Sequence, residues 1–178
     1  MIITVGGDAA SGPVEDALSL AEAVGAEIAK RGCILLCGGR GGIMKAACRG
    51  AEAGGGTTVG VLPGFDKSQA NAHVQIPIVT GLGEARNVVI ALTADAVIAI
   101  DGEYGTLSEI AHALNNGKPV VGMGTWMLTK DGREAPIHRT EDPVDAVRWV
   151  IEAATVPNFS SQPPAGTPGI NDKGVNNG

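Results

Sequence analysis

The fold of this chain is constrained most by its short apolar runs, which alternate with segments of helical periodicity. The runs are apolar at almost every position, which is typical of strands buried on both faces of a sheet. They cover Ile2–Val5, Ile34–Cys37, Thr57–Leu62, Ile76–Val79, Ala96–Ile100 and Pro119–Met123. Because these runs alternate with helical segments, the sequence predicts a doubly wound α/β fold, in which helices cover both faces of a parallel sheet.

Helices are predicted where apolar residues recur at helical spacing and glycine or proline then ends the pattern. They cover Glu15–Arg31, a small-residue segment ending near Ala53, about Gly83–Leu92, Thr106–Asn115 and Pro143 to about Ala154. Residues 1–156 are therefore expected to form one domain. Residues 157–178 are rich in Pro, Gly, Ser and Asn and have almost no periodicity, so they are predicted to form a disordered tail.

The composition argues against several classes of function. The net charge is −6, whereas a nucleic-acid-binding face needs a basic surface. No run approaches the roughly 18 apolar residues of a membrane span. The three cysteines include no C-x-x-C pair, which favours reduced thiols and a cytoplasmic protein. The histidines show no metal-ligand spacing, so no metal site is predicted.

Ligands of a doubly wound sheet bind beyond the carboxyl ends of its strands. Four glycine-containing segments stand at such ends: Gly6–Asp8, Gly38–Gly42, Gly81–Asn87 and Asp101–Glu109. Gly38–Gly42 exposes backbone N–H groups at the start of a helix, which suits a phosphate. The same glycines also fit a tight strand-to-helix turn without a ligand, and the loop matches neither G-x-G-x-x-G nor a Walker loop.

Arg86 falls in the first turn of a predicted helix, where a cation opposes the helix dipole. One interpretation is that Glu84 or a rotamer facing solvent relieves this repulsion. The other is that Arg86 and the helix N-terminus share a bound anion, which the arginine fork holds in a bidentate manner.

Thr106 and Glu109 are spaced as in a capping box, in which both side chains satisfy the first N–H groups of a helix. The same helix start also suits a ligand, because the Thr106 hydroxyl and the N–H groups after Gly105 are donors able to hold a phosphate. Glu109 would then accept a hydrogen bond from a sugar hydroxyl or take part in proton transfer. The two interpretations are compatible.

Three stretches together resemble the superfamily of LOG-type phosphoribohydrolases, whose members often carry the label "possible lysine decarboxylase". They are GGRGGIMKAACRGAEAGGGTTVGVLPG (38–64), IPIVTGLGEARNVVIALTADAVIAI (76–100) and DGEYGTLSEIAHALNNGKPVV (101–121). The compact size and the LPG…IPIVTGLG…AR run most resemble the branch that contains the molybdenum cofactor carrier protein. The resemblance covers roughly residues 1–154.

The resemblance implies a Rossmann-like fold, a homodimer or homotetramer, and a pocket for a nucleotide or cofactor phosphate. In LOG-type enzymes, an arginine before a helix and the glutamate that closes P-G-G-x-G-T-x-x-E carry the hydrolysis of nucleoside 5′-monophosphates to free base and ribose 5-phosphate. These two positions match Arg86 and Glu109. The ligand-binding set predicted from the loops and the resemblance is Gly6, Gly7, Gly38, Gly39, Arg40, Gly41, Gly42, Arg86, Asn87, Gly102, Glu103, Gly105, Thr106 and Glu109.

The chain departs from the enzyme motif at Asp101-Gly102-Glu103, where the enzymes have Pro-Gly-Gly. A carboxylate beside a phosphate cradle repels the anion. This favours a carrier of a phosphorylated, nucleotide-like ligand over a phosphoribohydrolase in which Arg86 and Glu109 are catalytic. The molybdenum cofactor is the expected ligand, molybdoenzymes are the expected partners, and no cofactor is required. A pyridoxal-phosphate decarboxylase is excluded, because no lysine stands in a Schiff-base setting.

Overall fold

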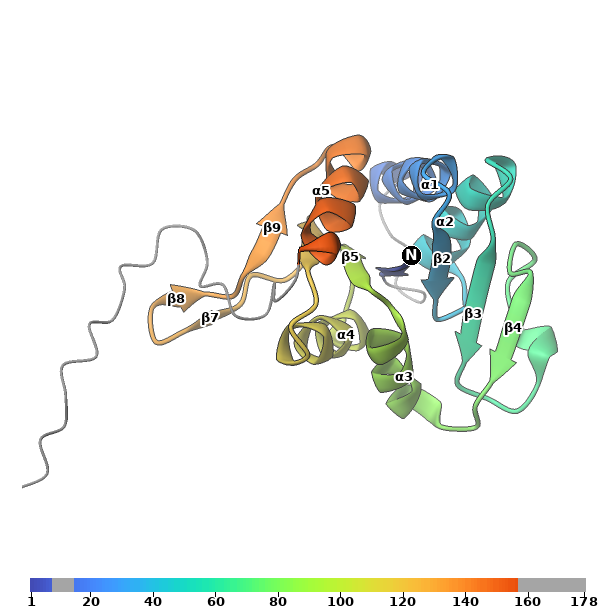
Figure 1. Ribbon diagram of the computed structural model, residues 1–178. Helices are drawn as coiled ribbons and strands as arrows, with labels where there is room; N and C mark the ends of the chain where they lie inside the picture. The colour runs from blue at the N-terminus through green and yellow to red at the C-terminus, as the bar shows by residue number, and fades with distance from the viewer. Residues whose placement is uncertain (8–14, 157–178) are drawn as a thin grey trace, which may run out of the picture.

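The computed structural model describes residues 1–7 and 15–156, which form a parallel sheet with helices on both faces (Figure 1). The sheet has the strand order β4-β3-β2-β1-β5-β6-β9, and every neighbouring pair is parallel. The strands are β1 (Ile2–Gly6), β2 (Ile34–Cys37), β3 (Thr58–Leu62), β4 (Ile76–Val79), β5 (Ala96–Ile100), β6 (Val120–Met123) and β9 (Ile137–Arg139). The predicted doubly wound α/β fold is confirmed, and the predicted tail at residues 157–178 lies outside the described residues.

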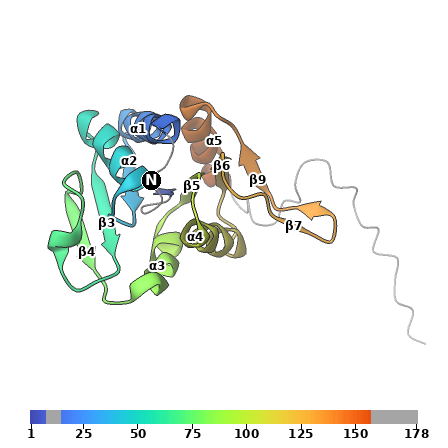
Figure 2. The same cartoon turned by 180° about the vertical axis from the view of Figure 1, so that it is seen from behind.

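Helices α1, α2 and α5 cover one face of the sheet, and α3 and α4 cover the other (Figures 1 and 2). The packing of β5 shows why its sequence is apolar throughout. Ile98 and Ile100 pack in the cluster that contains α1, α2 and α5, whereas Val97 and Ala99 pack with α4. Successive side chains of a strand point to opposite faces, so a strand covered on both sides needs apolar residues at every position. The helices are α1 (Glu15–Lys30), α2 (Gly42–Ala53), α3 (Arg86–Thr93), α4 (Tyr104–Asn115) and α5 (Pro143–Thr155).

Helices α1 and α2 approach each other closely because each supplies a glycine at the contact. A Cβ atom on Gly25 of α1 would lie 2.0 Å from the carbonyl oxygen of Ala47. A Cβ atom on Gly50 of α2 would lie 1.9 Å from the carbonyl oxygen of Glu22. Only glycine leaves room for backbone at these distances. The small residues of α2 therefore serve helix packing.

Strand β4 forms one edge of the sheet, and its Ile76 and Ile78 side chains are about half exposed. The N–H of Thr80, just beyond the strand, donates to the carbonyl of Leu62 in β3 at 3.2 Å. The backbone groups of successive residues point to opposite sides of a strand. Counting back from Thr80, the nitrogen of Pro77 therefore faces the open edge.

Three short strands that the apolar-run criterion does not predict follow β6. Strands β7 (Thr129–Lys130) and β8 (Arg133–Glu134) form an antiparallel hairpin that projects from the sheet, and β9 extends the sheet beside β6 (Figure 1). The hairpin turn consists of Asp131 and Gly132, which both have positive φ angles (52° and 74°), as a type I′ turn requires. The criterion misses these strands because they are two or three residues long and mostly polar.

Candidate functional site

The candidate site lies at the switch point of the sheet, where β1 and β5 are neighbours. The strand that follows β1 in the sequence lies on one side of this pair, and the strand that follows β5 lies on the other. The turns after β1, β2 and β5 all emerge at the carboxyl edge of the strands, where α/β folds bind ligands. The N-termini of α3 and α4 face the same region, because Asn87 of α3 donates a hydrogen bond to the carbonyl of Gly105 in α4 at 3.3 Å. The fold therefore gathers the segments that carry the predicted site residues.

Arg86 is the first residue of α3 and is only 4% exposed. Its Nη1 donates to the carbonyl of Val61 at 3.1 Å, while its Nε has no hydrogen-bond partner within residues 1–7 and 15–156. The guanidinium lies against Gly38, since a Cβ atom on this glycine would come within 1.9 Å of Nη1. The interpretation that Arg86 turns its side chain to solvent is therefore wrong.

Burial lowers the pKa of Arg86, and the carboxylate of Glu109 opposes this shift. An arginine nevertheless keeps its charge in proteins, because its ordinary pKa is far above neutral pH. Arg86 is therefore a buried cation whose Nε–H has no acceptor among the residues that the structure describes. Such an arrangement suits a bound anion, which would supply the missing acceptor.

Glu109 lies in the second turn of α4 and is 6% exposed. Burial raises its pKa from 4.5 to about 7, although the charge of Arg86 counteracts the rise and the charge of Glu84 adds to it. Its carboxylate lies beside Gly6, where a Cβ atom would come within 2.5 Å of Oε2. A carboxyl group with a pKa near 7 exchanges a proton readily at neutral pH, which is the property of a general acid or base.

The start of α4 differs from the prediction, because the helix begins at Tyr104 and not at Thr106. Its N-cap is Glu103, and no side chain makes a capping hydrogen bond there. The predicted capping box is therefore wrong. Thr106 instead lies inside the helix, buried against Gly102, where a Cβ atom would come within 2.3 Å of the Thr106 hydroxyl oxygen. Glu103 is exposed.

Asn87, the second residue of α3, is 2% exposed. Its Nδ2 contacts the Gly105 carbonyl and, at 3.4 Å, the hydroxyl of Ser108, while its Oδ1 has no partner among the residues that the structure describes. A buried polar atom without a partner is costly unless a ligand or water supplies one. Arg86 and Asn87 thus both leave a buried polar atom unpaired at the N-terminus of the same helix.

The glycine loop after β2 is held to the core through Cys37. The N–H of Gly39 donates to the sulfur of Cys37 at 3.2 Å, and this sulfur lies 3.5 Å from that of Cys48 in α2. Contact with Cys48 and burial raise the pKa of Cys37, so this thiol stays protonated. The φ angles of Gly39 (71°) and Gly42 (59°) are positive, which explains why glycine occupies both positions. The spacing of the cysteines along the sequence gives no signal for the Cys37–Cys48 contact, because this contact joins a strand to a helix.

The predicted residues thus range from buried to exposed; Gly7, Gly41, Gly42 and Gly102 are half-buried, and Gly105 is exposed. Arg86 contacts Gly38, and Glu109 contacts Gly6, so both side chains are packed against glycines that end strands. Gly7 is packed against Ile43, and Gly41 is the N-cap of α2. Arg40 and Glu103 are exposed. Glu84 is the residue near the site that the predicted set omits, and its proximity to Arg86 in sequence was the available signal.

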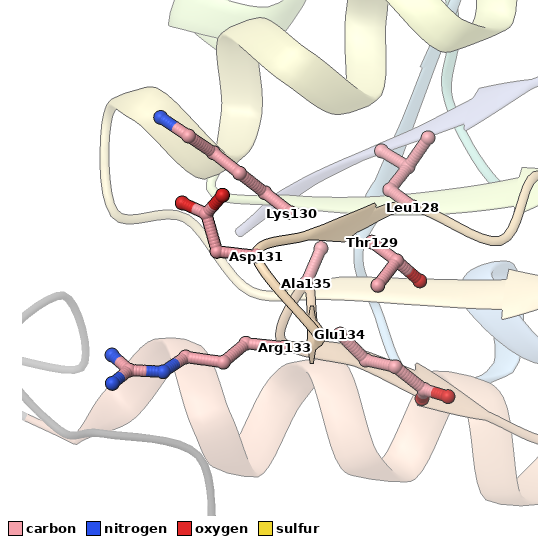
Figure 3. Close-up of a pocket in the computed structure, with 7 residues that line it drawn as sticks. All are labelled: Leu128, Thr129, Lys130, Asp131, Arg133, Glu134 and Ala135. Atoms are coloured by element: carbon pink, nitrogen blue, oxygen red, sulfur yellow. The ribbon is translucent and has the colours of Figure 1, made fainter.

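Two surface cavities lie elsewhere. One of about 580 Å³ is lined by residues 128–131 and 133–135 of the β7–β8 hairpin (Figure 3). Another of about 400 Å³ lies between this hairpin and the turn after β9. Neither contains a predicted site residue. Within the described part of the chain, no group of three or more metal-ligating side chains is present, and no helix is long and apolar enough to cross a membrane.

The pKa of Glu109 predicts a pH-dependent stability. The folded state binds its proton up to about pH 7, whereas the unfolded chain releases it near 4.5. Its contribution to the free energy of unfolding is therefore complete below pH 4.5 and is lost as the pH rises to 7, by about 3 kcal/mol. Glu109→Gln should lack this loss. Urea denaturation of both proteins at pH 4.5, 6 and 7.5 measures the difference, and parallel curves would contradict the assigned pKa.

The described residues therefore form a Rossmann-like domain with a buried arginine and a buried glutamate at its switch point. The chain belongs to the SLOG cluster4 family, whose sequence model matches residues 1–148. The structure of the molybdenum cofactor binding protein from Rippkaea orientalis is similar, with a TM-score of 0.77 and 33% identity over 86% of this chain and 97% of that one.

Two further similar proteins differ in function, since one is a cofactor carrier and the other is a phosphoribohydrolase. The Moco carrier protein of Chlamydomonas reinhardtii has a TM-score of 0.74 and 39% identity over 85% of this chain and 95% of that one. The cytokinin riboside 5′-monophosphate phosphoribohydrolase of Mycobacterium tuberculosis is 36% identical over 127 residues, which are 66% of this chain and 68% of that protein. The predicted resemblance to LOG-type proteins and to the branch with the carrier protein is confirmed.

Proposed function

We propose that this protein binds and carries a phosphorylated, nucleotide-like ligand, and that the ligand is the molybdenum cofactor. The observation that carries the proposal is the buried Arg86: its guanidinium lies against Gly38, and its Nε has no hydrogen-bond partner in the described part of the chain. In the proposed complex the terminal phosphate accepts hydrogen bonds from Arg86 and from the N–H groups at the start of α4. Thr106 and the loop Gly38–Gly42 complete the phosphate site, and Glu109 contacts the rest of the ligand.

The likeness to carrier proteins supports this ligand. The cofactor binding protein of Rippkaea orientalis and the carrier protein of Chlamydomonas reinhardtii are matched over almost their full length, whereas the mycobacterial hydrolase is matched over about two thirds. The turn Asp101-Gly102-Glu103 also differs from the Pro-Gly-Gly of LOG-type enzymes. Because Glu103 is exposed, its repulsion of a phosphate is weakened by water, so this difference supports the carrier only modestly.

Calorimetric titration with molybdopterin tests the proposal. We expect saturable binding in the micromolar range and a raised melting temperature in the presence of the ligand. Transfer of the bound cofactor to an apo-molybdoenzyme would extend the support from binding to carriage. The absence of binding at tens of micromolar would refute the carrier function.

A phosphoribohydrolase is the second candidate, and the raised pKa of Glu109 favours it. In this reaction Arg86 orients a nucleoside monophosphate, and Glu109 assists the attack of water on the anomeric carbon. Release of adenine from AMP, abolished by Glu109→Gln and by Arg86→Ala, would establish the enzyme. Adenine release that survives both substitutions would remove these two residues from the reaction.

The proposed carrier is a cytoplasmic homodimer or homotetramer that delivers its ligand to molybdoenzymes. The expectation of an oligomer comes from the family resemblance. Sedimentation equilibrium of the full chain measures it, and a monomer at micromolar concentration would contradict it.

A further inference from the structure

Two oppositely charged side chains face each other near the candidate site. Arg40 belongs to the glycine loop after β2, and Glu84 belongs to the short 3₁₀ helix η2 (Gly83–Ala85) that precedes α3. The distance between Nη1 of Arg40 and Oε1 of Glu84 is 3.8 Å. The pair therefore joins the two segments that hold Gly38 and Arg86, which are in contact beneath it.

This ion pair contributes little to the stability of the fold. Its side chains are 50% and 68% exposed, and exposed pairs at such a distance have small net energies. The two charges of the pair also act on the buried residues of the candidate site. Glu84 raises the pKa of both Arg86 and Glu109, and Arg40 lowers the pKa of Arg86. Arg40, Glu84 and Glu109 therefore all act electrostatically on Arg86.

An incoming anion meets Arg40 before it reaches the buried Arg86, because only Arg40 is exposed. In the absence of a ligand, Arg40 interacts with Glu84. A ligand phosphate competes with this carboxylate for the Arg40 guanidinium, and any charge beyond the first phosphate is repelled by Glu84. The repulsion between unit charges 4 Å apart in water corresponds to about a fivefold change in affinity.

We propose that Glu84 is a specificity-determining residue that holds Arg40 and makes the site prefer phosphate monoesters to diphosphates. This inference rests on the proposed function, because it requires a phosphate at Arg86. It assigns to the exposed pair a role in ligand selection that neither the predicted site residues nor the family resemblance includes.

The experiment compares the affinities of AMP and ADP in calorimetric titrations of the full chain. Wild type should prefer AMP. Glu84→Gln should bind AMP about fivefold more tightly, and its ADP:AMP affinity ratio should rise about fivefold. Glu84→Asp, which keeps the charge, should retain the wild-type ratio. In an Arg40→Gln background, Glu84→Gln should improve AMP binding less, because no guanidinium is released.

Glu52→Gln is the matched control. Glu52 is also exposed and paired, with His73 at 2.7 Å, but it lies at the end of α2 remote from η2. Glu52→Gln removes one negative charge from the molecule, as Glu84→Gln does. A ratio that is unchanged by Glu84→Gln, or that changes equally in Glu52→Gln, would overturn the inference while leaving the proposed function intact. If wild type binds neither nucleotide nor molybdopterin, the proposed function fails, and the inference fails with it.

Discussion

Alanine in place of Gly50 is expected to lower the free energy of unfolding by about 3 kcal/mol. The added Cβ atom would lie 1.9 Å from the carbonyl oxygen of Glu22, so α1 and α2 would have to separate. Helix propensity alone predicts the opposite sign, because alanine stabilises a helix interior by about 1 kcal/mol relative to glycine. Urea denaturation followed by circular dichroism measures the change.

Gly105→Ala is the control for this prediction. Gly105 is also in a helix, but the nearest atom that its Cβ would meet is Nδ2 of Asn87 at 3.8 Å, an ordinary contact. We expect its free energy of unfolding to be unchanged or slightly raised. Equal stability of Gly50→Ala and wild type would show that α1 and α2 do not approach as closely as the structure indicates.

Arg86→Ala is expected to weaken the binding of molybdopterin or AMP by at least about 100-fold. Hydrogen bonds to charged groups contribute about 1.5–3 kcal/mol each, and arginine forms two of them with a phosphate. Arg86→Lys keeps the charge but loses the planar fork, so its affinity should lie between those of wild type and Arg86→Ala. Titration calorimetry measures the affinities, and circular dichroism confirms that the variants are folded.

Gly38→Ala tests the same arrangement without removing the charge. Its Cβ atom would lie 1.9 Å from Nη1 of Arg86 and would displace the guanidinium. We therefore expect weaker binding here as well. Arg49→Ala is the charge-matched control, because Arg49 is exposed and pairs with Glu22 on the outer helices. Binding that is the same in Arg86→Ala and Arg49→Ala would exclude Arg86 from the ligand site.

The sequence allowed the fold to be predicted because each buried strand is apolar on both faces. It also predicted that Arg86 and Glu109 lie near the carboxyl ends of the strands, because both follow a strand and begin a helix. Their role in binding a ligand stays a prediction. The contacts of these side chains were not predictable. Whether Arg86 faces solvent or Gly38 depends on the order of the strands, which brings the end of β2 and the start of α3 together from distant parts of the chain.

Local patterns misled where tertiary packing decided the outcome. Thr106 and Glu109 have the spacing of a capping box, yet α4 starts two residues before Thr106. Both side chains therefore belong to the helix, and both are buried. The positive φ angles of Asp101 (51°) and Gly102 (100°) turn the chain sharply enough to allow this earlier start. The same limit explains the missed Cys37–Cys48 contact, which joins a strand end to a helix.

The proline in β4 affects how the folded molecule behaves at high concentration. An exposed sheet edge with about half-exposed Ile76 and Ile78 is a surface to which a strand of another chain can add, which leads to aggregation. The nitrogen of Pro77 faces outward and carries no hydrogen, so this four-residue edge offers an added strand no donor at that position. Pro77 thus protects the protein against fibre-like self-association without altering its own sheet.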